Sequence, residues 1–108
     1  MIQRSLSAST VKVLQTFLED PATDHYGYQI MKTTRLKSGS LYPILRRLEA
    51  DGWLTVHDEK IDEKAEGRPA RRIYRLTALG QQAGRSAVTE FYRSLGPHPS
   101  WLPNLGTP

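Results

Sequence analysis

The sequence predicts a mainly α-helical protein with a small two-stranded antiparallel β-hairpin and a further C-terminal helix. Two observations carry this prediction. An amphipathic helix pattern over residues 38–50 stops at Gly52 and is followed at once by a strand pattern, and a polar stretch over residues 58–68 separates that strand from a second one over residues 71–76. This is the order of elements in a winged helix-turn-helix, and 108 residues suffice for one such domain.

A first helix is expected from the capping residues and the apolar spacing near the N-terminus. Ser9 or Thr10 is the candidate N-cap, and the helix should end before Pro21. The expected apolar face consists of Val11, Leu14, Phe17 and Leu18. Residues 20–25 contain several turn-forming residues and predict a loop.

A second helix is expected over residues 27–33, with Tyr28 or Ile30, together with Met31, facing inward. Residues 34–37 then form a brief connection to the central helix. Connections of this length join the two helices of a helix-turn-helix.

The central helix combines an apolar stripe with a small, basic opposite face. The stripe has the spacing i, i+3, i+4, i+7 and consists of Leu41, Ile44, Leu45 and Leu48. The opposite face consists of Gly39, Tyr42, Pro43, Arg46, Arg47 and Ala50. Proline fits the first helical turn, so the helix should start between Ser38 and Ser40. Taken alone, such a helix is ordinarily a solvated surface helix, and the hairpin after it favours DNA reading.

The hairpin is expected to begin after Gly52, which is a natural residue to end a helix. In its first strand Trp53, Thr55 and His57 alternate with Leu54 and Val56. In its second strand Arg71, Ile73 and Arg75 alternate with Arg72, Tyr74 and Leu76. The acidic side chains between the strands are expected to be solvated and are Asp58, Glu59, Asp62, Glu63 and Glu66.

These motifs together resemble the PadR family of transcriptional regulators. Four motifs keep the family's order and spacing: Ser38-Gly39-Ser40-Leu41-Tyr42-Pro43, Arg46-Arg47-Leu48-Glu49-Ala50-Asp51-Gly52, Gly67-Arg68-Pro69 and Tyr74-Arg75-Leu76-Thr77-Ala78-Leu79-Gly80. The segment Tyr26-Gly27-Tyr28-Gln29-Ile30 is similar to the family's His-Gly-Tyr-Glu-Ile, with Tyr26 and Gln29 as departures. The resemblance covers roughly residues 10 to 80.

The resemblance implies a sequence-specific DNA-binding transcriptional regulator, a dimeric repressor that occludes a promoter at a palindromic double-stranded operator. The expected DNA-binding residues are Ser38, Gly39, Ser40, Tyr42, Pro43, Arg46, Arg47, Arg68, Arg71 and Arg72. The charge distribution agrees, because the net charge is +4 and 11 of the 15 Lys and Arg residues lie between residues 32 and 75. Such residues neutralise phosphates and release counterions.

The last helix is expected to start at a Thr77 cap and to reach about Leu95. Its apolar stripe either packs on the first helix or, as the resemblance implies, forms the dimer through Val88, Phe91, Tyr92 and Leu95. The chain thus divides into a DNA-binding domain over residues 1–76, a dimerisation helix over residues 77–95 and a Pro- and Gly-rich, flexible tail over residues 96–108. Trp101 and Leu102 are the tail's large apolar pair.

No catalytic, metal or cofactor site is expected. His25, His57 and His98 lack the spacing of metal ligands, and the chain has no cysteine. It also lacks a G-x-S-x-G elbow and a Gly-rich phosphate loop. With no apolar run long enough for a signal peptide or a membrane span, we expect a cytoplasmic protein without a membrane partner.

Two functions of other classes stay open at this point. One is a winged-helix interaction module whose basic wing binds an acidic protein. The other is a sensor of small aromatic compounds, because some relatives release DNA on binding such effectors, and Phe91 and Tyr92 are candidates to line the site. Aromatic stripes at helical spacing are more often core.

Overall fold

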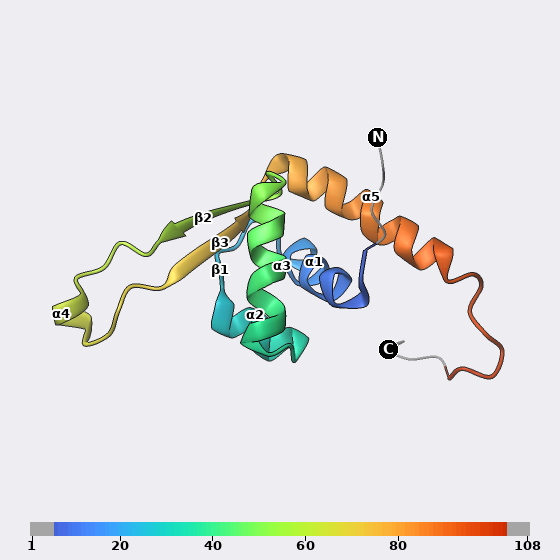
Figure 1. Cartoon of the computed structure of the whole chain (residues 1–108), viewed down its shortest axis with the longest axis horizontal. Coiled ribbons are helices and arrows are strands. Elements are labelled where there is room, and N and C mark those ends of the chain that lie inside the picture. Colours follow the sequence, from blue (N-terminus) through green and yellow to red (C-terminus); the bar gives the residue numbers. More distant parts are fainter. Residues whose placement is uncertain (1–5, 104–108) are drawn as a thin grey trace.

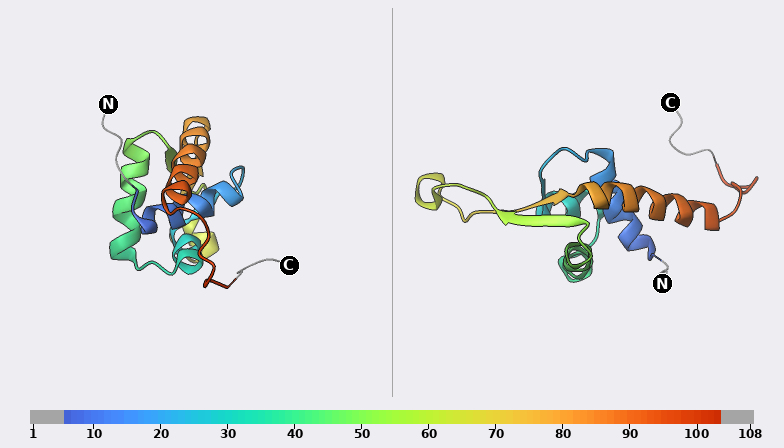
Figure 2. Two further views of the ribbon diagram at one scale, coloured as in Figure 1. Left: turned by 90° about the vertical axis from the view of Figure 1, so that its right-hand side faces the viewer. Right: turned by 90° about the horizontal axis from the view of Figure 1, so that it is seen from above.

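The computed structural model describes residues 6–103, which contain five helices and three short strands. In chain order they are α1 (Ala8–Glu19), β1 (His25–Tyr26), α2 (Gly27–Thr34), α3 (Ser38–Ala50), β2 (Leu54–Asp58), α4 (Glu63–Glu66), β3 (Arg72–Leu76) and α5 (Ala78–Ser94). The helices α1, α2 and α3 form a central block from which the β2–β3 hairpin and α5 extend in opposite directions (Figures 1 and 2). Residues 1–5 of the predicted DNA-binding domain and residues 104–108 of the predicted tail lie outside the described residues.

The core lies where α1 meets α2, α3 and α5. Its most deeply buried side chains are Val13, Leu14, Phe17, Ile30, Leu41 and Leu45. The predicted stripe of α3 is confirmed, since Leu48 is also buried and Ile44 packs against the cluster. Val13 was not among the residues expected to face inward on α1. It is buried because α1 has neighbours on several sides and therefore buries more than one stripe.

The sheet has three antiparallel strands in the order β1-β3-β2, one more than the sequence analysis expected. The hairpin register pairs Leu54 with Leu76 and Asp58 with Arg72. The additional strand, His25–Tyr26, begins at the last residue of the predicted loop and pairs with Tyr74 and Ile73. Two residues cannot show a strand periodicity, so backbone pairing alone defines β1.

The observed helix ends refine the predicted ones. Ser7, not Ser9 or Thr10, caps α1, and its hydroxyl accepts a hydrogen bond from the Thr10 N–H at 3.1 Å. The starts of α2 and α3 agree with the predictions. In α2 it is Ile30 that faces inward, whereas Tyr28 is 74% exposed. The short helix α4 at the tip of the hairpin was not predicted, because one helical turn is too short to show an apolar stripe.

The turn between α3 and β2 is joined to the start of α5. Gly52 has φ +79° and ends α3 as predicted. Thr77 caps α5 as predicted, accepting a hydrogen bond from the Gly80 N–H at 2.9 Å, and its hydroxyl also donates to the Gly52 carbonyl at 2.7 Å. The Thr77 N–H donates to the Trp53 carbonyl at 3.0 Å. These bonds hold α5 at the base of the hairpin.

Gly80 lets α5 approach the Trp53 backbone, and no larger residue would fit. A Cβ atom at this position would overlap the Trp53 carbonyl group, which is backbone and has no rotamer to escape into. The glycine of the Tyr-Arg-Leu-Thr-Ala-Leu-Gly motif is therefore a packing requirement of the fold.

We predict that Gly80→Ala destabilises the protein by about 3 kcal/mol, the upper part of the range for overpacked sites. Gly39→Ala is the matched control, because a Cβ there would meet nothing within 4 Å. That variant should gain up to about 1 kcal/mol from helix propensity. Urea unfolding followed by circular dichroism measures both, and equal stabilities for the two variants would contradict the close approach.

Candidate nucleic-acid interface

The turn between α2 and α3 is held by side-chain and backbone hydrogen bonds. The buried Thr34 hydroxyl donates to the Ile30 carbonyl at 2.7 Å and accepts from the Leu36 N–H at 3.3 Å. Arg35 ends α2 in the left-handed region, with φ 61°, and its N–H donates to the Met31 carbonyl at 2.7 Å. The predicted connection is thus a defined turn that sets the angle of α3 relative to α2.

The outer face of α3 presents small residues and two unpaired arginines. The exposed residues of this face include Ser38, Gly39, Ser40, Pro43, Arg46 and Arg47. Arg46 and Arg47 take part in no ion pair within residues 6–103. Their guanidinium groups are therefore available to an external partner.

Tyr42 differs from the other residues predicted on this face, because it is half-buried and packs against the core. Its phenol lies against the α-carbon of Gly27, where a Cβ atom would overlap the hydroxyl. Tyr42 thus fills the seam between α2 and α3. The helical spacing predicted an outward position for Tyr42, because spacing within one helix cannot show a contact with Gly27 of another helix.

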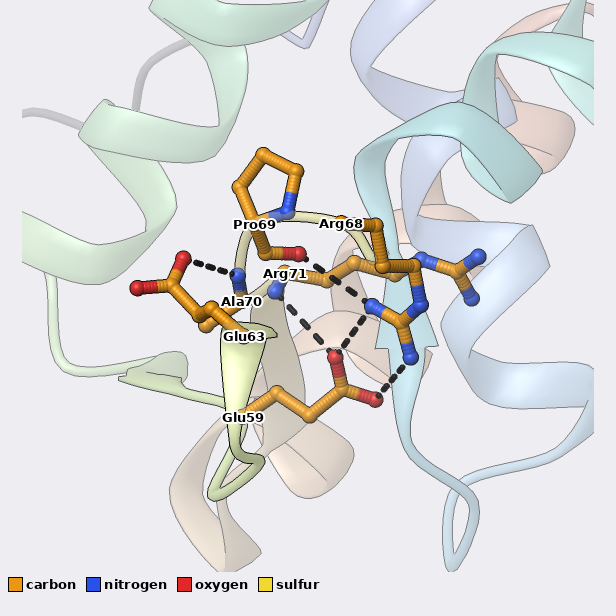
Figure 3. Close-up of polar contacts among 6 residues, drawn as sticks. All are labelled: Glu59, Glu63, Arg68, Pro69, Ala70 and Arg71. Carbon is orange, nitrogen blue, oxygen red and sulfur yellow. Dashed lines mark hydrogen bonds and ion pairs between the residues drawn. The ribbon is translucent and has the colours of Figure 1, made fainter. Parts of the chain in front are cut away.

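The wing, residues 54–76, carries an ordered network near its tip (Figure 3). The Glu59 carboxylate accepts two hydrogen bonds from the Arg68 guanidinium, at 2.7 and 3.2 Å, and one from the Arg71 N–H at 3.2 Å. The Glu63 carboxylate accepts one from the Ala70 N–H at 2.8 Å. The hydrogen bond from Arg68 lowers the pKa of Glu59, and the same bond raises the pKa of Arg68.

This network gives Arg68 a partner inside its own wing. The sequence analysis expected Arg68 to reach DNA phosphates from the hairpin tip. In the structure its guanidinium is bound by Glu59 and also donates to the Pro69 carbonyl at 3.2 Å. A bidentate arginine–carboxylate pair has a fixed geometry, so Arg68 holds together the two sides of the wing.

Arg71 and Arg72 lie at the start of β3, at the end of the paired strands nearer the α4 loop, and both are exposed. The Arg71 guanidinium carbon lies 5.5 Å from the centre of the Tyr26 ring, a cation–π contact between the wing and the start of α2. Beside them is a hollow of about 230 Å³, lined by Gly27, four tyrosines and these two arginines. One of the tyrosines is Tyr74, and burial raises the pKa of its phenol, with Tyr42 adding to the effect and a hydrogen bond from Arg72 opposing it.

The last helix divides into a packed half and a free half. Gly84 lies next to Leu14 and Leu18, and Val88 is only 9% exposed. Val88 was predicted in the dimer interface, but its side chain belongs to the core of its own chain. Beyond it the exposed fractions rise to 49% for Tyr92 and 64% for Leu95.

The predicted histidine positions are scattered. His25 lies in β1 rather than in a loop, is buried against Phe17, and its Nε2 is 3.0 Å from the Asp20 carbonyl oxygen. His57 is exposed on β2. Across residues 6–103 no three His, Asp or Glu side chains gather as a metal site would require. In the same part of the chain, no helix is both long and apolar enough to cross a membrane.

Comparison with known proteins places the chain among transcriptional regulators. Residues 16–86 match the model of the Transcriptional regulator PadR-like family. The transcriptional regulator Rv3488 of Mycobacterium tuberculosis is 46% identical over 61 residues, which are 56% of this chain and 49% of that protein. The match thus spans about half the length of this curated relative.

Solved structures show the same fold. AbfR of Staphylococcus epidermidis is 29% identical, with a TM-score of 0.65 over 85% of this chain and 56% of AbfR. Reduced AbfR bound to DNA is 30% identical, with a TM-score of 0.66 over 87% of this chain and 61% of that one. The protein smu.1704 of Streptococcus mutans is 25% identical, with a TM-score of 0.63 over 87% of both chains.

We predict that Glu59→Ala removes the hydrogen-exchange protection of the Arg71 amide, because that amide loses its carboxylate acceptor. Arg68→Ala should loosen the same amide. Glu63→Ala is the control and should expose the Ala70 amide instead. In the unaltered protein, protection at Arg71 should be complete above pH 4.5, the ordinary pKa of Glu59, and disappear as the pH falls through the lowered value. Exchange measured by NMR that is the same in all three variants would rule out the network.

Proposed function

The chain belongs to the PadR-like family of transcriptional regulators, and we propose that it acts as a sequence-specific, dimeric repressor that binds a palindromic operator. The observation that supports this most is the outer face of α3. It combines small residues, which let the helix backbone come close to DNA, with Arg46 and Arg47, which have no ion-pair partner in residues 6–103. The relative AbfR, with a similar fold, has been crystallised bound to DNA.

In this proposal α3 enters the major groove. Ser38, Gly39, Ser40 and Pro43 line the side that approaches the bases and phosphates, and the two arginines supply base readout. An arginine contacts the O6 and N7 atoms of guanine through two parallel hydrogen bonds. Tyr42 contributes from the seam with α2, so its part is to set the helix position and to touch the DNA backbone.

In this proposal the wing contacts the DNA backbone through the start of β3 rather than through the loop that carries α4. Arg71 and Arg72 are exposed there. The tip carries the acidic α4, which phosphates repel. Arg68, which was expected to touch phosphate directly, acts in this proposal by keeping the wing in shape through Glu59.

The dimer forms through the free half of α5. Tyr92 and Leu95 provide the exposed apolar surface, with the half-buried Phe91 beside them, whereas Val88 is excluded because it is already buried in its own chain. A twofold axis near these residues would place two α3 helices on successive major grooves, about 34 Å apart along the DNA. Occupying two half-sites in a promoter blocks access to it.

We predict that Arg46→Ala or Arg47→Ala weakens operator binding by about 1–3 kcal/mol for the arginine that is bidentate to guanine. Binding to scrambled DNA should change much less. Arg85→Ala, a substitution of an exposed arginine on the packed half of α5, is the control and should leave both affinities unchanged. Fluorescence anisotropy with operator and scrambled duplexes provides the measurement. If both α3 variants keep full preference for the operator, these arginines do not read bases.

We also predict that the double variant Tyr92→Asp, Leu95→Asp is monomeric, because the dimer would bury two carboxylates without partners. Leu79→Asp is the matched control: Leu79 is an exposed apolar residue at the other end of α5, 55% exposed, and its variant should remain dimeric. Sedimentation equilibrium distinguishes the two states. A dimer that persists in the double variant would place the interface elsewhere.

A further inference from the structure

The hollow between α2, α3 and the wing has the chemistry of an anion site. Arg71 and Arg72 both line it, and none of its lining residues is acidic. Four phenol groups also line it, and phenol hydroxyls donate hydrogen bonds to phosphate oxygens. Tyr74 lines it although the residue is only 4% exposed. The acids close to these lining residues are Glu59, which accepts the Arg71 N–H, and Glu49 of α3, which acts on the Tyr74 phenol.

The start of α2 adds further donors to the same place. Gly27 and Tyr28 are the first two residues of this eight-residue helix and line the hollow. The N–H groups of a first helical turn have no partner within the helix, and the helix dipole favours a negative charge there. The N-cap, Tyr26, makes no capping hydrogen bond through its side chain.

Arg71 is held at both ends. Its N–H donates to Glu59 in the wing, and its guanidinium lies over the Tyr26 ring at the edge of the hollow. Tyr26 is also fixed by its pairing with Ile73 in the sheet. The aromatic ring is therefore placed to keep the Arg71 charge beside the hollow rather than in solvent.

We propose that this hollow seats one backbone phosphate of the bound DNA, and that Tyr26 is the positioning residue that keeps Arg71 over it. The inference rests on the proposed DNA-binding function and names one contact within it. The hollow lies between the two elements assigned to DNA, with Tyr42 of α3 on one side and Arg71 and Arg72 of the wing on the other. A strand that passes from α3 to the wing crosses it.

The test uses operator duplexes in which one phosphate at a time is replaced by a neutral methylphosphonate. In the unaltered protein, one position in each half-site should weaken binding about tenfold, the effect of losing one charge-assisted hydrogen bond. In Arg71→Ala the substitution at that position should have no further effect. Arg46→Ala is the control and should keep the full tenfold sensitivity there.

Two variants of Tyr26 test the positioning role. Tyr26→Phe retains the ring and should keep the sensitivity to methylphosphonate at the position that Arg71 recognises, although it lacks one phenol donor. Tyr26→Leu removes the ring and should become insensitive at the position where Arg71→Ala is insensitive. Circular dichroism and thermal unfolding confirm that both variants are folded.

The outcomes are separable. If the unaltered protein does not prefer its operator, the proposed function fails before the scan begins. If the unaltered protein prefers its operator, but Arg71→Ala is as sensitive as the unaltered protein at each methylphosphonate position, the phosphate seat is wrong. If Tyr26→Leu keeps the sensitivity that Arg71→Ala loses, the seat stands and the positioning role is wrong. In a further outcome, inorganic phosphate shifts the NMR signals of the hollow in the unaltered protein but not in Arg71→Ala, while no operator position is sensitive to methylphosphonate. That result would assign the hollow to a free anion and overturn the DNA contact.

Discussion

The close approach of Gly80 to the Trp53 carbonyl group is the constraint on which the arrangement of the molecule depends. It brings the end of α3, the start of β2 and the start of α5 to one point, and the two hydrogen bonds of Thr77 close that point. The helix α3 and the wing thereby leave the core in fixed directions. A side chain at Gly80 would separate α5 from the turn, and α3 and the wing would no longer be held at one common point.

The wing shows how acidic and basic residues in one short segment serve different ends. Its carboxylates are not only solubilising groups, because Glu59 and Glu63 satisfy backbone N–H groups of the opposite side of the loop. Arg68 is taken up by that internal network. The number of arginines in the segment therefore overstates how many are free to meet DNA, whereas Arg71 and Arg72 are exposed at the start of β3.

Much of the fold followed from local patterns. The stripe of α3, its glycine stop and the Thr77 cap each depend on residues within about two helical turns, so the sequence alone predicts them. What it could not show depends on contacts between distant segments. The strand β1 exists only through its pairing with β3, and the overlap that requires Gly27 becomes visible only beside Tyr42. Of the candidate site, the exposed residues of α3 were predictable, whereas the role of Arg68 depended on a carboxylate nine residues earlier.

The packed half of α5 has a mechanical consequence. From Gly80 to Val88 the helix packs against α1 and the turn at Trp53, so this half is not free to move relative to the core. Only the last two turns project, a lever of about 10 Å at 1.5 Å per residue. In a dimer joined through these last two turns, a small tilt at the twofold axis would directly change the distance between the two α3 helices. Such a dimer would tolerate little change in the spacing of its two half-sites on DNA, and a slight change at the axis would be enough to release it.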